Sequence, residues 1–463
     1  MTASPFDTVA AVSTPFGKGG VAVIRLSGDR AGEITDRVFF PADGKPVTAH
    51  PPRTALYGEV RDPDDRRVLD DALCTRFSAP HSFTGEDVVE ISCHGGVLVT
   101  RNVLEACLRA GARQALPGEF TRRAYLNGKI SLERAEALGN LLDAGSDEQV
   151  KLARAGMSGL LTASAEEVYR ELCGVLANLE AGMDFPEEDL TELTREEMRT
   201  AVTTAATAVE SLIATYRTGH AIAEGVPTVI CGRPNVGKSA FYNRLVGRDA
   251  AIVTDIAGTT RDILTDTATL GRVTLRLSDT AGLRESDDPV ERMGVDRARR
   301  AMEDAELVLL LTDEWGAGGE ASSEEELATA LQDRGQAVIR VLTKRDLHGD
   351  PPIASADVIP TVAVSSVTGE GFDALSAAVE SAFIDGELRM GEEAVVFSAR
   401  QAAALRECAA CLRVAADNLA AGLPYDISAD DIRAAMGELG GLCGRELRED
   451  VISEIFSRFC VGK

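Results

Sequence analysis

Cys231-Gly232-Arg233-Pro234-Asn235-Val236-Gly237-Lys238-Ser239 decides how the middle of this 463-residue chain folds. The stretch fits the phosphate-binding pattern G-x-x-x-x-G-K-[ST]. An apolar run of strand type, Val226 to Cys231, precedes the loop, and a helical stretch, Ala240 to Val246, follows it. Strand, loop and helix therefore come in the order that phosphate binding needs, which predicts an α/β nucleotide domain. A chance glycine-rich turn is the alternative.

The loop residues have distinct expected roles. Glycines at 232 and 237 let backbone N–H groups surround phosphate oxygens, and the start of the following helix adds its positive dipole end. We expect Lys238 to neutralise the β- and γ-phosphates, which makes it a candidate catalytic residue, and the Ser239 hydroxyl to ligate Mg²⁺. The residues of the loop expected to bind the nucleotide are Asn235, Val236, Gly237, Lys238, Ser239 and Ala240.

A second motif predicts which base is bound. Thr343, Lys344 and Asp346 follow a strand-like apolar run, Val338 to Leu342. The Asp346 carboxylate can accept hydrogen bonds from N1–H and the exocyclic amine of guanine, whereas adenine would leave the carboxylate unpaired. GTP is therefore the expected nucleotide, and an adenine-nucleotide enzyme is the alternative. The motif resembles the N-K-x-D signature of GTPases, with Thr343 in the place of the usual Asn.

A third motif follows at ordinary GTPase spacing. Ser365, Ser366 and Val367 resemble the last guanine loop, S-A-K, and depart from it at Ser366 and Val367. Each guanine motif is weak by itself. Their order after the phosphate loop supports guanine recognition.

Two switch regions are expected between these motifs. Asp255 to Asp262 resembles switch I, in which Thr260 completes the Mg²⁺ shell only when a γ-phosphate is present. Leu275 to Gly282 is an alternating strand that runs into the D-x-x-G of switch II, with Asp279 as an outer-sphere Mg²⁺ partner. The switch residues expected to bind the nucleotide are Thr254, Asp255, Ile256, Ala257, Gly258, Thr259, Thr260, Asp279, Thr280, Ala281 and Gly282.

Catalysis requires a departure from the Ras pattern, because Leu283 follows Gly282 and cannot orient a water molecule. The chain here resembles the tRNA modification GTPase family known as MnmE or TrmE, in the stretches Asn235–Ser239, Ala251–Asp262 and Asp279–Arg284. The resemblance implies that K⁺ replaces an arginine finger and that Glu291 orients the water. The implied K⁺ ligands are Asn235, Thr254, Ile256 and Thr259. Without the resemblance, a loop packing role for Asn235 and a solvated helix-face charge for Glu291 are the alternatives.

The same resemblance extends over the rest of the chain. It is carried by the stretches Pro15–Gly20, Ile24–Gly28, Phe83–Glu90, Cys93–Gly96, Pro117–Ala124, Leu126–Lys129 and Phe459–Lys463. It implies an N-terminal domain that binds a reduced folate, 5,10-methylene- or 5-formyl-tetrahydrofolate, at a homodimer interface. The implied contacts are Arg25, Glu90, Lys129 and Lys463. A carboxylate suits the edge of a pterin, and cations suit the carboxylates of a glutamate tail.

Cys460 is the fourth residue from the end of the sequence. A flexible tail could deliver its thiol to a one-carbon unit, which makes Cys460 a candidate catalytic residue. A buried small residue is the equal alternative.

Length and composition predict several domains in a reducing compartment. The chain is long enough for about three domains. We expect an α+β folate-binding-like domain over residues 1–120, an all-α domain over 121–220 and 386–463, and an α/β P-loop GTPase domain inserted at 221–385. Neither a targeting peptide nor a membrane span is recognisable, and nine scattered cysteines do not form a disulfide framework. The expected location is the cytoplasm.

The net charge of −26 argues against a broad contact with a phosphate backbone. We therefore expect RNA contacts to be local or shared. The resemblance implies a flavin- and NADH-dependent partner that forms a heterotetramer with this chain and presents tRNA. It implies that the complex adds carboxymethylaminomethyl or aminomethyl to C5 of the wobble uridine. The alternative is a regulatory GTPase that assembles ribosomes, which would ordinarily carry a basic RNA-binding appendage.

Overall fold

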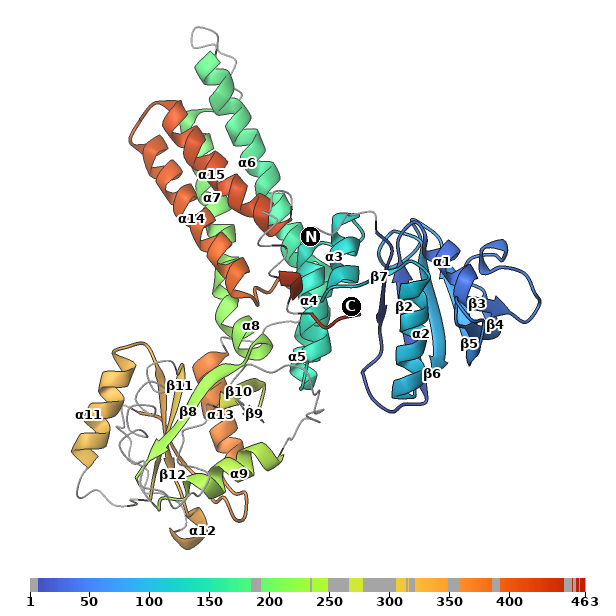
Figure 1. The fold of residues 1–463 in the computed structure, drawn as a ribbon. Helices are drawn as coiled ribbons and strands as arrows, with labels where there is room; N and C mark the ends of the chain where they lie inside the picture. Colours follow the sequence, from blue (N-terminus) through green and yellow to red (C-terminus); the bar gives the residue numbers. More distant parts are fainter. Residues whose placement is uncertain are drawn as a thin grey trace. The chain divides into compact units, whose positions relative to one another are not determined.

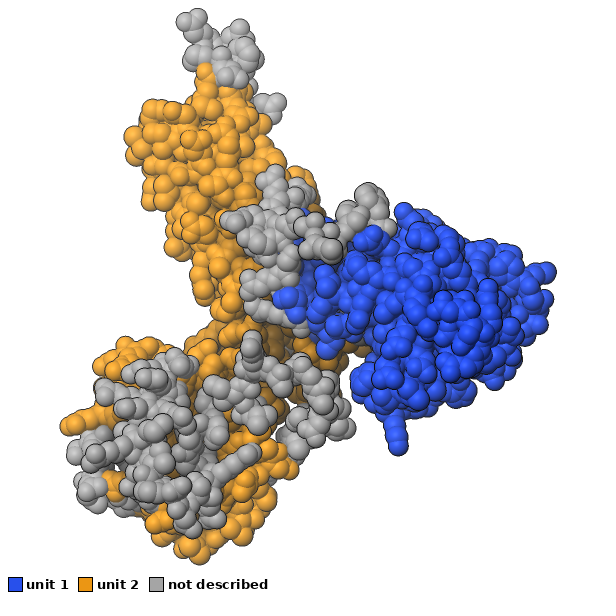
Figure 2. Space-filling model, viewed as in Figure 1, with its two compact units in different colours: residues 1–139, 443–463 blue, residues 140–442 orange. Residues whose placement is uncertain are grey.

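The computed structural model describes residues 7–184, 193–233, 235–248, 266–277, 305–313, 315, 321–348, 359–384, 392–444, 452, 455–457 and 459–462. Contacts within the chain divide it into two compact units (Figure 2). The first unit comprises residues 1–139 and 443–463, and the second comprises residues 140–442. Within the described ranges, none of the helices has the length and apolarity that a bilayer span requires.

The first unit is built on a seven-stranded sheet of order β3-β4-β5-β6-β2-β1-β7 (Figure 1). All neighbouring pairs are antiparallel except β1 with β7. Its elements are β1 (Val9–Val12), β2 (Val21–Ser27), α1 (Ala31–Val38), β3 (Phe39–Pro41), a 3-10 turn (Val47–Ala49), β4 (Ala55–Arg61), β5 (Val68–Phe77), β6 (Val88–His94), α2 (Val97–Arg109), β7 (Arg113–Gln114) and α3 (Glu119–Leu126).

Alternation along β2 decides which side chains enter the core. Ala22, Ile24 and Leu26 are buried with residues of α1 and α2, because successive side chains of a strand point to opposite faces. Arg25 lies on the other face, opposite Glu90 of β6 in the antiparallel register. The strand-like runs predicted at Val21–Leu26, Leu69–Phe77 and Asp87–Ser92 are confirmed within one or two residues.

The C-terminal segment belongs to this first unit. Val461 forms an antiparallel bridge with Pro117, and the Ser13 hydroxyl donates to the carbonyl of Gly462 at 3.0 Å. Phe456 is buried beside Leu132, the first residue of helix α4 (Leu132–Asp143). The helical stretch predicted over Asp430–Phe459 is wrong as a single helix, because helix α15 (Tyr425–Leu442) ends at Leu442 and Gly444 turns the chain with φ +79°.

The helical part of the second unit is a bundle in which α14 packs against α7 and α15, and α6 packs against α7 and α15 (Figure 1). The helices of this unit outside the nucleotide module are α5 (Asp147–Ser158), α6 (Leu160–Asp184), α7 (Arg195–Ala214), α8 (Tyr216–Ala223), α14 (Ala399–Ala420) and α15 (Tyr425–Leu442). Helix α4 (Leu132–Asp143) begins in the first unit and ends in the second. Capping boxes start α7 at Thr194 and α14 at Ser398. A helix running through Ser146–Leu161 was the expectation; Gly159, with φ +81°, divides it instead.

The nucleotide module of the second unit is a six-stranded sheet of order β13-β12-β11-β8-β10-β9. Its strands are parallel except for the β9–β10 pair. The elements are β8 (Val226–Gly232), α9 (Lys238–Arg248), β9 (Asp266–Leu270), β10 (Val273–Leu277), β11 (Leu307–Thr312), α11 (Ala321–Gln332), β12 (Ala337–Leu342), α12 (Arg345–His348), β13 (Thr361–Ala363) and α13 (Phe372–Phe383). An α+β unit, a helical bundle and an α/β nucleotide module are thus all present, as the sequence predicts.

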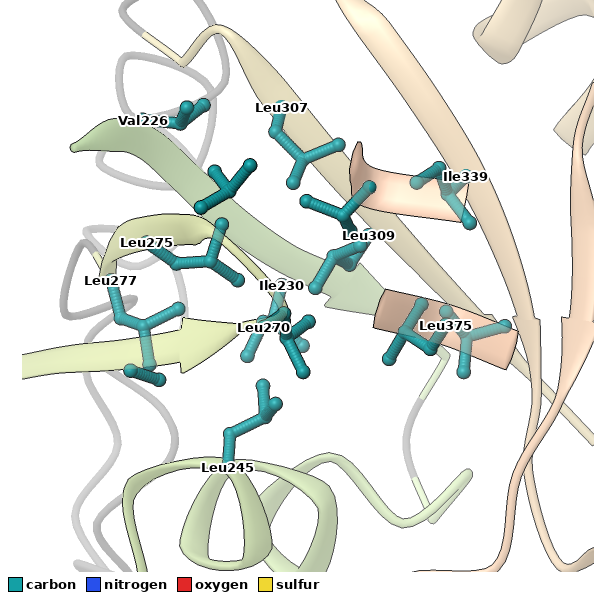
Figure 3. Close-up of a cluster of buried hydrophobic side chains, with 14 of the residues drawn as sticks. Val226, Ile230, Leu245, Leu270, Leu275, Leu277, Leu307, Leu309, Ile339 and Leu375 are labelled. Carbon is teal, nitrogen blue, oxygen red and sulfur yellow. The ribbon is translucent and has the colours of Figure 1, made fainter. Parts of the chain in front are cut away.

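One apolar cluster holds the helices α9 and α13 against this sheet (Figure 3). Ile230 of β8 and Leu309 of β11 lie at its centre, where Leu245 of α9 and Leu375 of α13 meet them. The central strands are apolar along their whole length because helices cover both faces of a parallel sheet. This packing fixes the carboxyl ends of the strands, where nucleotides bind in open α/β sheets.

Helix α8 connects the bundle to the nucleotide module. It contacts α5 and α7 on one side and β8, β10 and α13 on the other. The returning chain docks on the same place, because the Val396 N–H donates to the Thr215 hydroxyl at 2.9 Å. A Cβ on Gly219 would lie 2.1 Å from the Val396 carbonyl oxygen, so only glycine allows this approach.

Candidate nucleotide-binding site

The phosphate loop connects the end of β8 to the start of α9, as the sequence predicts. Gly232 closes β8 with φ +150°, and a Cβ there would lie 2.2 Å from the Leu311 carbonyl oxygen on β11. Asn235 and Gly237 both have positive φ, at +68° and +95°. The backbone is thereby folded into a turn at the helix N-terminus, the arrangement that binds anions through N–H groups.

Lys238 is the first residue of α9, and its side chain is directed back into the loop. Its ammonium donates to the carbonyls of Gly232 at 2.9 Å and Arg233 at 2.7 Å. Burial lowers the pKa of Lys238. A partly desolvated ammonium held in this way interacts strongly with an anion that enters the loop.

The guanine loop is bound directly to the phosphate loop through Thr343. The Thr343 hydroxyl donates to the carbonyl of Val236 at 2.7 Å, and both residues are buried. The Thr343 N–H donates to the Thr312 carbonyl at 2.9 Å, which continues the β11–β12 pairing by one residue. A threonine therefore joins the two loops at the position where GTPases usually carry an asparagine.

Asp346 and Ser365 lie together at the expected base-binding end. The Ser365 hydroxyl donates to a carboxylate oxygen of Asp346 at 2.6 Å, and Ser365 itself is fully buried. The Ser365 oxygen also accepts the Thr368 N–H at 3.1 Å. The carboxylate is thus fixed by its neighbour, while its other oxygen can pair with a base edge.

Two further residues predicted for this end differ in their exposure. Ser366 is half-buried, whereas Val367 is 78% exposed. The structure brings together Asn235, Val236, Gly237, Lys238, Ser239, Ala240, Thr343, Lys344, Asp346, Ser365, Ser366 and Val367 around the carboxyl ends of β8, β12 and β13.

The predicted switch residues, the water-orienting acid and the last residue lie outside the described residues. They are Thr254, Asp255, Ile256, Ala257, Gly258, Thr259, Thr260, Asp279, Thr280, Ala281, Gly282, Glu291 and Lys463. Strand β10, expected to lead into Asp279, ends at Leu277 beside β8. Over the described part of the prediction the alternation is confirmed, because Leu275 and Leu277 are buried in the apolar cluster and Arg276 between them is only half-buried.

A second group of predicted residues lies in the first unit, around the segment from Pro80 to Glu86. Arg25 forms an ion pair with Glu90 at 2.8 Å, and its guanidinium lies 5.6 Å from the centroids of the Phe83 and Phe120 rings. Lys129 donates to the Pro80 carbonyl at 2.8 Å. Arg25 and Lys129 therefore both contact the segment from Pro80 to Glu86, and Glu90 is paired with Arg25.

Ion pairs among Glu86, Arg113, Glu119 and Arg123 connect this segment to helix α3. Arg123 pairs with both Glu86 and Glu119 at 3.0 Å, and Arg113 pairs with Glu119 at 2.7 Å. Burial raises the pKa of the Glu119 carboxyl, but hydrogen bonds from Arg113, the Leu116 N–H and Arg123 outweigh burial and leave the pKa below its usual value. Glu119 is therefore ionised and fixes the start of α3.

Cys460 is exposed, so the alternative of a buried small residue is wrong. Its carbonyl accepts the Gly118 N–H at 3.3 Å, two residues before the Phe120 ring that contacts Arg25. The tail thus brings this thiol into the same unit as Arg25 and Glu90. A thiol that solvent reaches can react, which a packed thiol cannot.

Two family models match this chain and together cover nearly all of it. The model described as the GTP-binding protein TrmE N-terminus matches residues 8–129, and the one described as the MnmE helical domain matches residues 132–460. The chain belongs to the MnmE family.

Curated relatives match this MnmE-family chain from end to end. A protein named tRNA modification GTPase MnmE from Symbiobacterium thermophilum is 43% identical over 461 residues, which is 99% of each chain. Proteins of the same name from Geobacillus thermodenitrificans and Bacillus subtilis are 39% and 38% identical, again over 99% of this chain. Among solved structures, the FeoB G-domain from Methanococcus jannaschii is 20% identical and covers 34% of this chain and 97% of its own, with a TM-score of only 0.24.

Sequence reasoning missed two residues of the guanine end in this MnmE-family chain. Asp313 forms an ion pair with Lys344 at 2.6 Å, and the Trp315 indole N–H donates to the Thr343 carbonyl at 3.0 Å. Both follow β11, which is parallel to β12. The sequence could have indicated them, because the carboxyl ends of neighbouring parallel strands meet at one edge of the sheet, so residues after β11 are expected near those after β12.

Proposed function

We propose that this MnmE-family chain is a GTPase that takes part in modifying the wobble uridine of tRNA. One observation carries the proposal: the chain matches proteins named tRNA modification GTPase MnmE over 99% of its length. The joined phosphate and guanine loops support the nucleotide part, because Asp346 is fixed where it can accept two hydrogen bonds from guanine. Adenine would leave this carboxylate unpaired.

Hydrolysis is proposed to involve Mg²⁺ and K⁺. The exposed hydroxyl of Ser239, at the second position of α9, is a hard oxygen donor of the kind that Mg²⁺ prefers. Asn235 is exposed at the tip of the loop and offers an amide oxygen for K⁺, alongside the proposed ligands Thr254, Ile256 and Thr259. Such cations neutralise charge that develops on the phosphates. Lys238 binds the phosphates, and Glu291 is proposed to orient the water.

The proposed K⁺ role of Asn235 can be tested without backbone strain. Asn235 has φ +68°, in the left-handed region, which Asn tolerates because its side chain can form local hydrogen bonds. Asn235→Ala would lose those bonds and would therefore strain the backbone. Asn235→Gly removes the oxygen and keeps the backbone. We expect the wild-type chain to hydrolyse GTP faster in KCl than in NaCl, and Asn235→Gly to lose that difference. Equal wild-type rates in the two salts would contradict the K⁺ proposal.

A reduced folate is proposed to bind in the first unit. Glu90 is 29% exposed beside Arg25, so its carboxylate can face a pterin edge while Arg25 keeps it ionised. Lys129 and Lys463 are proposed to neutralise the glutamate tail, and Cys460 to act near the one-carbon unit. We expect Glu90→Gln to weaken binding of 5-formyl-tetrahydrofolate by the full chain about tenfold. Glu59→Gln, which changes an ion pair with Arg61 on the same sheet, is the matched control.

The proposed assembly is a homodimer that joins a flavin- and NADH-dependent partner in a heterotetramer. The acidic balance of this chain, −26, supports a division of labour in which the partner holds the tRNA. Under this proposal the complex acts in the cytoplasm and transfers the one-carbon unit to C5 of the wobble uridine.

Nucleoside mass spectrometry of tRNA from cells lacking this chain tests the function as a whole. We expect loss of the carboxymethylaminomethyl or aminomethyl group at the wobble uridine, and its return with the wild-type chain but not with Lys238→Ala. Unchanged wobble nucleosides together with altered ribosome profiles would refute the proposal and favour the assembly-factor alternative.

A further inference from the structure

Trp315 is the single tryptophan of the chain and lies at the guanine end of the nucleotide module. Its indole N–H donates to the Thr343 carbonyl at 3.0 Å. Its ring stacks on His348, with centroids 5.0 Å apart and an interplanar angle of 17°. The tryptophan therefore holds both the first residue of the guanine loop and the end of the short helix α12.

Thr343 forms hydrogen bonds with three separate elements. Its N–H donates to the Thr312 carbonyl, its hydroxyl donates to the Val236 carbonyl at 2.7 Å and lies 3.3 Å from the Thr312 carbonyl, and its own carbonyl accepts from Trp315. These bonds connect β11, the phosphate loop and the segment after β11. A chain of contacts thus runs from the Trp315 indole through Thr343 to Val236.

The hydroxyl of Thr343 has only one proton, and the 2.7 Å bond to Val236 uses it. Thr343 cannot donate a second hydrogen bond to a base, as a side-chain amide with two N–H groups could. Guanine selection in this chain therefore depends on how accurately the backbone presents Asp346. That accuracy requires Thr343 to be held in place.

The loop also carries local strain that external contacts must offset. Lys344 adopts φ +61°, in the left-handed region that is unfavourable for a residue with a Cβ. Its ammonium pairs with Asp313, two residues before Trp315. Asp313 and Trp315 thus hold consecutive residues of the guanine loop from the same neighbouring segment.

We propose that Trp315 is a positioning residue for guanine-nucleotide binding, which acts through Thr343 on the distance between the guanine and phosphate loops. This inference rests on the proposed function only in taking the ligand to be a guanine nucleotide. Because Trp315 contacts neither Lys238 nor Ser239, losing its hydrogen bond should weaken ground-state and transition-state binding equally. Such a loss raises KM and leaves kcat unchanged.

The test compares full-length variants by GDP titration and by steady-state GTP hydrolysis. Trp315→Phe keeps an aromatic ring that can stack on His348 and removes the N–H donor together with part of the ring. We expect it to raise the Kd for GDP and the KM for GTP about two- to tenfold, the effect of one hydrogen bond, with kcat unchanged. Leu347→Ala is the matched control, because Leu347 lies beside His348 on α12 and is 72% exposed. This variant should leave the Kd for GDP unchanged.

A double-mutant cycle tests the path through Thr343. Thr343→Val removes the hydroxyl at nearly constant volume, and Thr343→Ser should recover most of the affinity that Val loses. If Trp315 acts by keeping the hydroxyl on Val236, Trp315→Phe has a smaller effect in the Thr343→Val chain than in the wild type. If Trp315→Phe raised the Kd for GDP by the same factor in the Thr343→Val chain and in the wild type, Trp315 would not act through the Thr343 hydroxyl.

Further outcomes separate this inference from the proposed function. A wild-type Kd retained in Trp315→Phe, or a fall in kcat with KM unchanged, overturns the positioning role and leaves the GTPase proposal intact. A wild-type chain that binds ADP as well as GDP refutes guanine recognition itself.

Discussion

The backbone N–H of Gly118 donates a hydrogen bond to the carbonyl of Cys460, at 3.3 Å, and so attaches the C-terminal tail to the start of α3. Gly118 has φ +63°, and a Cβ there would lie 2.2 Å from the Phe456 carbonyl oxygen. Both the backbone conformation and the close approach of the tail therefore require glycine at this position.

Gly118→Ala should release the tail. The left-handed conformation costs an alanine about 1 kcal/mol, and the clash with Phe456 adds to this cost. Gly128→Ala provides the control, because Gly128 has φ +66° with open space around its Cβ position. Limited proteolysis should cut the tail faster in Gly118→Ala only. Equal rates in the two variants would show that the contact with Phe456 does not hold the tail.

Glu119 should make the first unit sensitive to acid. Its pKa is lowered on folding, so its contribution to stability is present above the unfolded pKa of 4.5 and is lost as the pH falls through the folded value. Glu119→Gln should destabilise the protein by roughly 2 kcal/mol at pH 7, because Arg113 and Arg123 lose a charged partner. The difference from wild type should shrink at low pH, as measured by urea unfolding at several pH values.

His220 should act in the opposite pH direction at the junction of α8 with the nucleotide module. Its interaction with Glu306, 3.7 Å away and directly before β11, raises the pKa of His220 above the ordinary 6.5. The stabilisation is complete below pH 6.5 and is lost as the pH rises through the raised value. His220→Gln should reduce the difference in Tm between pH 6 and pH 8. If the Tm difference between pH 6 and pH 8 persists in His220→Gln, groups other than His220 cause it.

Two exposed helix glycines should be sites of stabilisation. A Cβ added to Gly174 of α6 or to Gly437 of α15 would have nothing within 4 Å of it, so alanine should add about 0.5–1 kcal/mol at each. Gly139 of α4 is the contrast, since its Cβ would lie 3.1 Å from the Phe459 ring. Thermal unfolding should show a gain for Gly174→Ala and Gly437→Ala, and none for Gly139→Ala.

Local sequence signals predicted the phosphate loop and the guanine loops, the parts of the nucleotide site that the structure describes. The phosphate loop requires glycines at fixed positions between a strand and a helix, and this pattern identified the residues from Asn235 to Ala240. Asp346 and Ser365 were identified in the same way, and the structure places them in contact. These features depend on residues close together in sequence, which is why the sequence alone sufficed.

Contacts between distant segments could not be predicted. The bond from Thr343 to Val236 joins residues 107 positions apart, and the attachment of Cys460 to Gly118 joins segments far apart in the chain. Helical periodicity continues past Leu442, yet α15 ends there because Gly444 adopts a left-handed backbone. Such endings depend on what the next segment packs against, which periodicity does not report.

The docking of Val396 on Thr215 and Gly219 places the two crossings between bundle and nucleotide module at one point. When the two ends of an inserted module lie next to each other, the module can be deleted and the flanking helices joined by a short linker. The helical bundle should then fold without the nucleotide module. We therefore expect the nucleotide module to be replaceable. Replacing it with another nucleotide-binding module between these two points should leave the fold of the helical bundle unchanged.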